Sequence, residues 1–311
     1  MPVSSLIIEE FIKNGYSKKG KKRVWQITNP NLLFATPEAA NGFYNLKDYD
    51  IYRNNVIDKE IFLLKKNANM IAKRVETQPF NLIDMRCAGG KRAHEFIKAI
   101  NSDVEVRYCP AGMHPALTHS TIKFIKQLGL KNITDYYSQT TSFDKLVNLP
   151  ATLRNATFQK NVILMFGSTL ALFEINDFLF HLSRNMFKND TLIIGIGIRK
   201  GQRLVNLETY QDVSFNNWFV PLMRELGFKD NEVSYNARFG NSRIECFYTL
   251  LIDKTIRYKG KKIALKKGDE IVAAVIYKYY EKELKKFCKM YFSDVQIFRD
   301  DNGYVLLVCK K

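Results

Sequence analysis

The chain has 311 residues, of which 46% are hydrophobic and 13% aromatic, with sixteen glycines and eight prolines. This composition supports a packed core and excludes a largely disordered chain. The longest apolar run, residues 162–173, contains Gly167 and Ser168 and is too short to cross a bilayer, so we expect no membrane partner.

The charge balance favours anionic partners, since 48 basic side chains face 31 acidic ones and give a net charge of +17. Such a field attracts polyanions, so nonspecific nucleic-acid binding is one expectation. The basic residues gather at 18–23, 259–267 and 282–289, but no RNA-binding signature accompanies them. A lysine-rich, solvated surface explains the same clusters.

Cysteine usage and the first residues predict a cytoplasmic protein. The five cysteines are widely spread and form no C-x-x-C pair, which favours reduced thiols over disulfides or a zinc site. The first ten residues lack a basic segment and include two glutamates, unlike a secretory signal. His114 and His119 have no third ligand nearby in the sequence, so we expect no bound metal.

Along the chain, residues 1–75 form a predicted helical portion, with helical spacing at 9–13 and 58–74. Residues 76–200 then alternate short apolar strands with helices. The expected strands are 81–85, 104–108, 132–136, 162–166 and 191–198, and the expected helices are 93–100, 116–128 and 174–186. Continuous apolar strands separated by helices are typical of a parallel sheet covered on both faces.

Residues 201–311 have a different pattern, which predicts an α+β portion packing with the N-terminal region. The expected elements are a helix at 216–226, paired strands at 232–239 and 243–253 continued by 257–265, a long helix at 269–291, and a closing hairpin of 295–300 and 304–309.

The most informative segment, residues 80–97, reads as a strand, a loop with paired glycines and a helix. In doubly wound sheets this arrangement binds nucleotide-like ligands through backbone N–H groups at the carboxyl end of the strand. The candidate ligand-binding residues of this segment are Asp84, Arg86, Gly89, Gly90 and Lys91. An arginine stands at 86, where a glycine would allow a ligand to approach. The structural alternatives are a solvent-facing or salt-bridged arginine and an aspartate that caps the loop.

Five segments occur in an order that resembles one family. They are residues 80–92, 108–117, 166–172, 235–246 and 268–279, which carry the glycine loop, a strand end with a following helix, a Gly-Ser-Thr turn, an Arg-Ile-Glu hairpin and a Lys-Tyr element. Over about residues 50–310 the chain is similar to the histidine-specific, S-adenosylmethionine-dependent methyltransferases of ergothioneine biosynthesis. The resemblance implies an α/β fold: a Rossmann-like class I methyltransferase sheet at 76–200 with an additional α+β substrate-type domain.

The resemblance also implies S-adenosylmethionine as cofactor and N-methylation of an amine. On the cofactor side it adds Gly112 after the second strand, Asp135 and Tyr136 beside the adenine, and Gly167 and Ser168 in the Gly-Ser-Thr turn. The positions implied for the substrate side are Tyr210, Asn216, Leu172, Ala274 and Ile276. No catalytic residue is assigned, because methyl transfer from a sulfonium mainly needs alignment of the amine.

Several positions depart from the family pattern. On the cofactor side, Arg86 and Ala88 replace loop glycines, Gly112 stands where an acid would hold the ribose, and Gly197 replaces an acid. On the substrate side, Leu172 replaces an asparagine, and Ala274 and Ile276 replace the glutamate and serine that bind imidazole.

Two functions therefore remain open. One is an active, divergent methyltransferase acting on a small-molecule or peptide amine other than free histidine. The other is a catalytically inactive methyltransferase-fold binding or scaffold protein, with a degenerate cofactor pocket and a protein partner.

Overall fold

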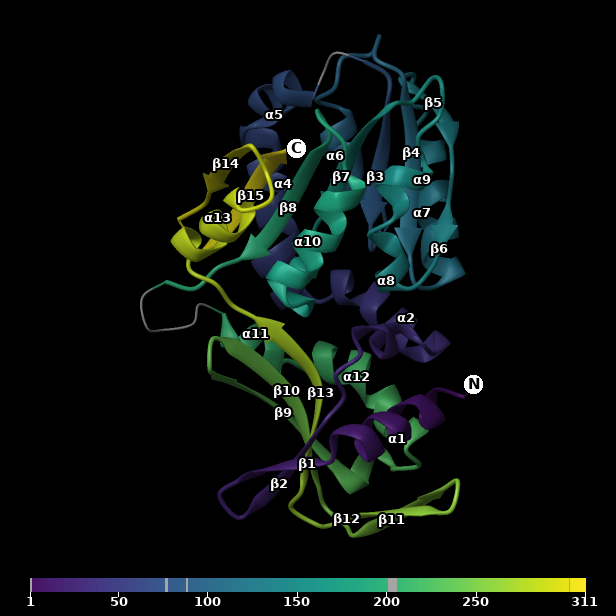
Figure 1. The fold of residues 1–311 in the computed structure, drawn as a ribbon, viewed down its shortest axis with the longest axis vertical. Helices are drawn as coiled ribbons and strands as arrows, with labels where there is room; N and C mark the ends of the chain where they lie inside the picture. The colour runs from purple at the N-terminus through teal and green to yellow at the C-terminus, as the bar shows by residue number, and fades with distance from the viewer. Residues whose placement is uncertain (1, 76–77, 88, 201–205, 302) are drawn as a thin grey trace. The chain divides into compact units, whose positions relative to one another are not determined.

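The computed structural model describes residues 2–75, 78–87, 89–200, 206–301 and 303–311, and it divides into two compact units (Figure 1). The accessory unit contains Met1–Ile51 and Asn206–Tyr277, and the core unit contains Tyr52–Val205 and Lys278–Lys311. This division differs from the expected boundaries at 75 and 200. Residues 52–75 and the closing hairpin group with the core unit because they pack on its sheet or extend it.

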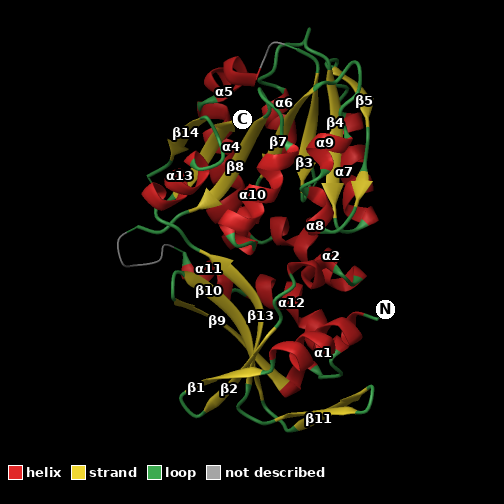
Figure 2. Cartoon of the chain, viewed as in Figure 1, coloured by secondary structure: helices red, strands yellow, loops and turns green. Residues whose placement is uncertain are grey.

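The core unit is built on one large sheet of order β14-β15-β8-β7-β3-β4-β5 (Figure 2). Its parallel strands are β3 (Phe80–Met85), β4 (Val106–Gly112), β5 (Ile133–Tyr136), β7 (Lys160–Met165) and β8 (Thr191–Gly197), and the short β6 (Gln139–Thr140) pairs with β4. The antiparallel hairpin β14 (Asp294–Arg299) and β15 (Tyr304–Lys310) joins through β8. This sheet confirms the predicted Rossmann-like class I fold.

Burial explains why the central strands were predictable. Every residue of β3 and β7 is buried, which explains why most of their residues are apolar. Helix α4 packs beside α6 on one face, and α10 packs beside α13 on the other (Figure 1). The helices of the core unit are α4 (Asp58–Lys66), α5 (Ala68–Val75), α6 (Lys91–Ile97), α7 (Pro115–Gln127), α8 (Phe143–Leu146), α9 (Leu149–Thr152), α10 (Ile175–Asn185) and α13 (Glu281–Lys289), with a π-helical turn at Arg53–Ile57 and a 3-10 turn, η4, at Thr169–Leu172.

The strand order creates a switch point between β3 and β7. The chain runs from β3 outward to β4 and β5, then crosses back to place β7 on the other side of β3. In open α/β sheets, ligands bind outside the carboxyl ends of the strands at such a point. The loops after β3 and β7 therefore frame the candidate site.

The accessory unit has its own sheet, of order β1-β2-β13-β10-β9. Its strands are β1 (Tyr16–Lys19), β2 (Lys22–Gln26), β9 (Val233–Gly240), β10 (Arg243–Leu250) and β13 (Glu270–Tyr277), and a separate hairpin consists of β11 (Lys254–Tyr258) and β12 (Lys261–Leu265). Its helices are α1 (Val3–Asn14), α2 (Pro37–Asn45), α11 (Leu207–Gln211) and α12 (Val213–Glu225), with 3-10 turns at Pro30–Phe34, Leu46–Asp48 and Asp230–Glu232; the short α3 (Asp50–Tyr52) ends at the unit boundary.

Two expectations about the accessory unit are wrong. The predicted long helix at 269–291 is instead β13 followed by α13, because the β-branched residues of 270–277 favour a strand that is buried between β2 and β10. The N-terminal portion is not wholly helical, because the basic cluster at 18–23 lies on the β1–β2 hairpin, which turns at Gly20. None of the described helices is long and apolar enough to span a bilayer.

The hairpin at the end of the chain should be essential to the core. Leu306 lies on β15 between β8 and β14 and is fully buried. We expect Leu306→Ala to lower the free energy of unfolding by about 2–5 kcal/mol through lost burial and a cavity. The same change at Leu128, which is 37% exposed, should cost less than about 1 kcal/mol. Chemical denaturation of both variants checks this, and equal losses would contradict it.

Candidate cofactor site

The loop after β3 retains the backbone of a glycine turn at three described positions. Arg86, Gly89 and Gly90 have φ values of 57°, 75° and 74°, in the left-handed region. The N–H of Arg86 donates to the carbonyl of Ala111 at 2.7 Å, and the N–H of Gly89 donates to Thr121 Oγ1 at 3.2 Å. Arginine is disfavoured in this region by roughly 1–2 kcal/mol, so its backbone shape is imposed by the surrounding contacts.

The side chain of Arg86 lies at the switch point. It is 7% exposed, and its Nη1 donates to Thr169 Oγ1 at 3.2 Å, which joins the end of β3 to the turn after β7. Burial lowers the pKa of Arg86 to about 10, so the guanidinium remains charged at neutral pH. The predicted alternative of a solvent-facing arginine is therefore wrong at this position.

A fully buried acid, Glu60, organises the same edge of the sheet. Its Oε2 accepts from Arg92 Nη1 at 2.7 Å, while its Oε1 accepts from the Gly167 N–H at 2.7 Å and from Tyr304 Oη at 2.6 Å. Burial opposes the charge of Arg92, but Glu60 outweighs this effect and raises the pKa of Arg92 above its ordinary value. Glu60 thus connects α4, α6, β15 and the turn after β7.

Sequence reasoning missed both members of this pair. The signal for Glu60 was an acid within the otherwise apolar face of 58–74, and the signal for Arg92 was its position directly after the glycine loop. Gly195 on β8 is a further mark of the pair, because a Cβ there would lie 2.1 Å from Glu60 Oε1. Glycine at 195 therefore leaves the space that the Glu60 carboxylate occupies.

Asp84 belongs to β3 itself and is 6% exposed. Tyr108 Oη donates to Asp84 Oδ2 at 2.7 Å. Burial raises the pKa of Asp84 to about 6, although the Tyr108 hydrogen bond and Arg92 act in the opposite direction. A carboxyl group at the carboxyl end of β3 can thus change its charge near neutral pH.

Some of the other predicted cofactor residues lie at the switch point, and the rest lie farther along the same edge of the sheet. Gly167 and Ser168 lie in the turn that also holds Thr169, and Ser168 Oγ accepts from the Gly197 N–H at 3.1 Å. Gly112 ends β4, where a Cβ would make ordinary contact, 3.5 Å from Thr118. Lys91 begins α6, and Asp135 and Tyr136 lie on β5, at the edge of the sheet.

The predicted substrate residues fall into both units. Leu172, half-buried, ends the η4 turn of the core unit, whereas Ala274 and Ile276 lie on β13 of the accessory unit and are 3% and 4% exposed. Tyr210 is buried in α11, where its carbonyl accepts from Tyr235 Oη at 2.6 Å. Asn216 lies inside α12 and its Oδ1 accepts from Tyr248 Oη at 2.9 Å, while Asp212 caps that helix.

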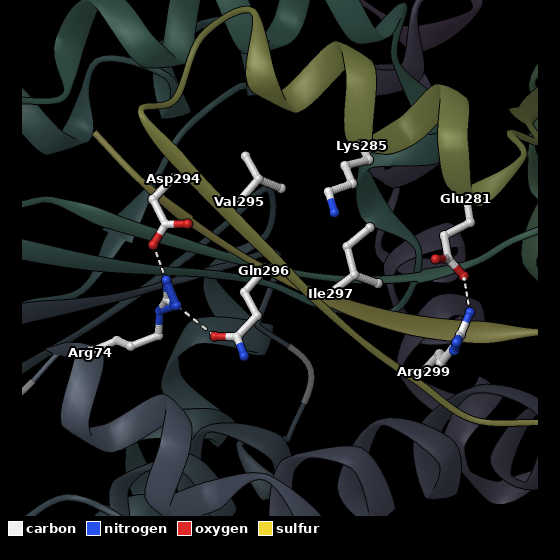
Figure 3. A pocket seen from close by; sticks show the side chains of 8 residues that line it. All are labelled: Arg74, Glu281, Lys285, Asp294, Val295, Gln296, Ile297 and Arg299. Carbon is white, nitrogen blue, oxygen red and sulfur yellow. Dashed lines mark hydrogen bonds and ion pairs between the residues drawn. The ribbon is translucent and has the colours of Figure 1, made fainter.

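A cavity of about 450 Å³ lies elsewhere in the core unit, beside α13 and β14 (Figure 3). Two ion pairs lie among its charged side chains, Arg74 with Asp294 and Arg299 with Glu281 at 3.6 Å, and Lys285 adds a further cation. Its lining residues come from α5, α13 and β14 and not from the loops after β3 and β7, so the switch point remains the candidate for the cofactor.

The sequence matches a family model described as histidine-specific methyltransferase, SAM-dependent, over residues 45–311. The chain belongs to this family. A search of curated proteins gave no match. S-adenosylmethionine is therefore the cofactor that family membership gives this chain.

The solved structures that are similar to this chain have low sequence identity to it. An S-adenosylmethionine-dependent methyltransferase from Clostridium acetobutylicum ATCC 824 is 12% identical, with 87% of this chain and 98% of that chain covered and a TM-score of 0.45. The CcbJ methyltransferase from Streptomyces caelestis is 9% identical, with 80% and 95% covered and a TM-score of 0.38. The glycopeptide N-methyltransferase MtfA, complexed with S-adenosylmethionine, is 10% identical, with 79% and 93% covered and a TM-score of 0.39. The family assignment rests on the family model alone.

The backbone around the switch point fits the family's cofactor. The left-handed turn is present at residues 86, 89 and 90, and Asp84 supplies an acid beside it, whereas Gly112 has no side chain that could accept from the ribose hydroxyls. The Arg86 side chain also departs from this fit, since it is buried at the switch point and bonded to Thr169.

The Glu60 network should tolerate no side chain at Gly195. We expect Gly195→Ala to lower the free energy of unfolding by about 3–5 kcal/mol, because the methyl group overlaps Glu60 Oε1 and displaces a buried ion pair. Gly240→Ala is the matched control, since a Cβ there has no neighbour within 4 Å. Denaturant unfolding of both variants is the measurement, and a Gly195→Ala protein as stable as the control would refute the tight contact.

The raised pKa of Asp84 predicts a pH dependence of stability. Between about pH 4 and 6 the unfolded chain releases the Asp84 proton while the folded chain retains it, so this residue makes the free energy of unfolding fall as pH rises. The effect should total about 2–3 kcal/mol and be absent from Asp84→Asn. Urea titrations of both proteins across this pH range test it; a constant difference between them would contradict the raised pKa.

Proposed function

We propose that the chain transfers a methyl group from S-adenosylmethionine to the nitrogen of an amine other than free histidine. The observation that carries this proposal is the apolar character of three substrate-side positions. By resemblance to the family, Leu172, Ala274 and Ile276 replace an asparagine, a glutamate and a serine, and the latter two positions are buried on β13. An imidazole that leaves one buried polar group unpaired loses about 1–3 kcal/mol of binding.

We assign cofactor binding to the residues at the carboxyl edge of the core sheet. These are Asp84, Gly89, Gly90, Lys91, Gly112, Asp135, Tyr136, Gly167 and Ser168; Arg86 lies at the same edge, with its side chain bonded to Thr169. The bound cofactor supplies an electrophilic methyl group, so the chain's main tasks are to orient the amine and to exclude water. By resemblance to the family, we assign substrate binding to Leu172 of the core unit and to Tyr210, Asn216, Ala274 and Ile276 of the accessory unit.

A second function is favoured by a different observation. The Gly167 N–H is taken by Glu60, and the Arg86 side chain is buried at the switch point. Both features would suit an inactive methyltransferase-fold protein that acts by binding a protein partner.

The charge and the cysteines support two further proposals. The net charge of +17 suggests nonspecific nucleic-acid binding. The five buried cysteines, none of them in a disulfide, suggest a cytoplasmic location.

A transfer assay with radiolabelled S-adenosylmethionine separates the two functions. We expect methylation of apolar amines, represented by leucine, phenylalanine and a short peptide, at least about tenfold faster than methylation of histidine, because one unpaired polar group costs about a factor of ten. Leu172→Asn should raise the rate with histidine relative to the wild type. Histidine as the best acceptor would overturn the proposed specificity.

The same assay applied to a whole lysate tests the second function. Label incorporated into any lysate component would eliminate an inactive protein as the explanation. No transfer to any amine or lysate component, from protein shown to be folded, would overturn the enzymatic proposal.

A further inference from the structure

The Arg86 side chain lies between the ends of the two strands that border the switch point. Its Cα follows β3 directly, and its guanidinium reaches Thr169, two residues beyond Gly167 in the turn after β7. The side chain therefore crosses the space between the two strand ends that border the switch point. With only 7% of the residue exposed, it occupies this space rather than covering it from solvent.

The surrounding contacts hold Arg86 in this place. Its N–H and that of Cys87 both donate to the Ala111 carbonyl, at 2.7 and 3.3 Å, which fixes the left-handed backbone. Thr169 is fixed in turn, because its hydroxyl donates to the carbonyl of Phe166. Arg92, a like charge, is committed to Glu60, so that carboxylate already has a strong partner.

We propose that Arg86 is a plug of the cofactor crevice: its side chain and S-adenosylmethionine compete for the same space, and the cofactor binds only when Arg86 leaves Thr169. This inference rests on the proposed function, since it takes S-adenosylmethionine as the ligand. The competition has a steric part and an electrostatic part. A buried guanidinium repels the cationic sulfonium of S-adenosylmethionine more than the neutral thioether of S-adenosylhomocysteine.

Calorimetric titration of the full chain with each ligand tests the plug. We expect Arg86→Gly and Arg86→Ala to bind S-adenosylmethionine at least about tenfold more tightly than the wild type, equivalent to about 1.4 kcal/mol, with a smaller gain for S-adenosylhomocysteine. Arg86→Ala removes the side chain but keeps a non-glycine residue at φ 57°. A gain in both variants therefore comes from emptying the crevice and not only from relief of backbone strain.

Asn241→Gly is the matched control for strain relief, because Asn241 has a φ of 51° in the exposed turn between β9 and β10. Its affinity for either ligand should equal that of the wild type. Thermal unfolding and circular dichroism establish that each variant is folded, and a ligand-induced rise in Tm gives a second readout of binding.

The outcomes separate this inference from the proposed function. If the wild type binds S-adenosylmethionine and neither Arg86 variant binds it more tightly, the plug is refuted while the proposed function stands. If the folded wild type and both folded variants show no binding at millimolar ligand, both the plug and the cofactor-dependent function are refuted.

Discussion

The carboxyl edge of the core sheet depends on one buried charge, the carboxylate of Glu60. An isolated carboxylate in a protein interior would carry a desolvation penalty of several kcal/mol. Here Arg92, the Gly167 N–H and Tyr304 Oη together satisfy it, and they come from three different parts of the core unit. Because each partner is positioned by a separate element, the carboxylate fixes α4, α6, β15 and the turn after β7 as one assembly.

This assembly determines what surrounds Arg86. Arg86 Nη1 donates to Thr169 Oγ1, while Arg92 pairs with Glu60. The Glu60 carboxylate also accepts a hydrogen bond from the Gly167 N–H. The family's glycine turn is thus retained in its backbone, while its side chains form an internal network of opposite charges and hydroxyl groups.

The parts of the fold that were predictable are those determined by local pattern. The strands β3, β7 and β8 are buried on both faces, so the apolar residues that dominate them identified them, and the loop glycines located the switch point. Residues 270–277 were assigned wrongly because a continuous apolar run has neither helical nor strand periodicity. Only pairing with β2 and β10 makes that segment a strand.

The position of the candidate site at the strand ends was predictable, but the side-chain pairs within it were not. Asp84, Arg86 and Gly167 follow or end strands that the pattern located, so their common edge could be inferred. The Glu60–Arg92 pair could not, since the two residues are 32 positions apart and are joined only by the packing of α4 on α6. Pair formation depends on tertiary contacts, which single-residue patterns do not encode.

The same contacts hold Arg86 in a conformation that carries an energetic cost. A solvated arginine on a loop would carry little energetic cost and have little meaning for function. Arg86 instead combines a left-handed backbone with a desolvated guanidinium, two conditions that glycine at this position would avoid. The network around Thr169 and Ala111 must supply enough stabilisation to offset both. The free energy that keeps Arg86 at the switch point is therefore the free energy that a ligand must overcome to displace it. At this side chain, the stability of the core unit opposes its capacity to bind the cofactor.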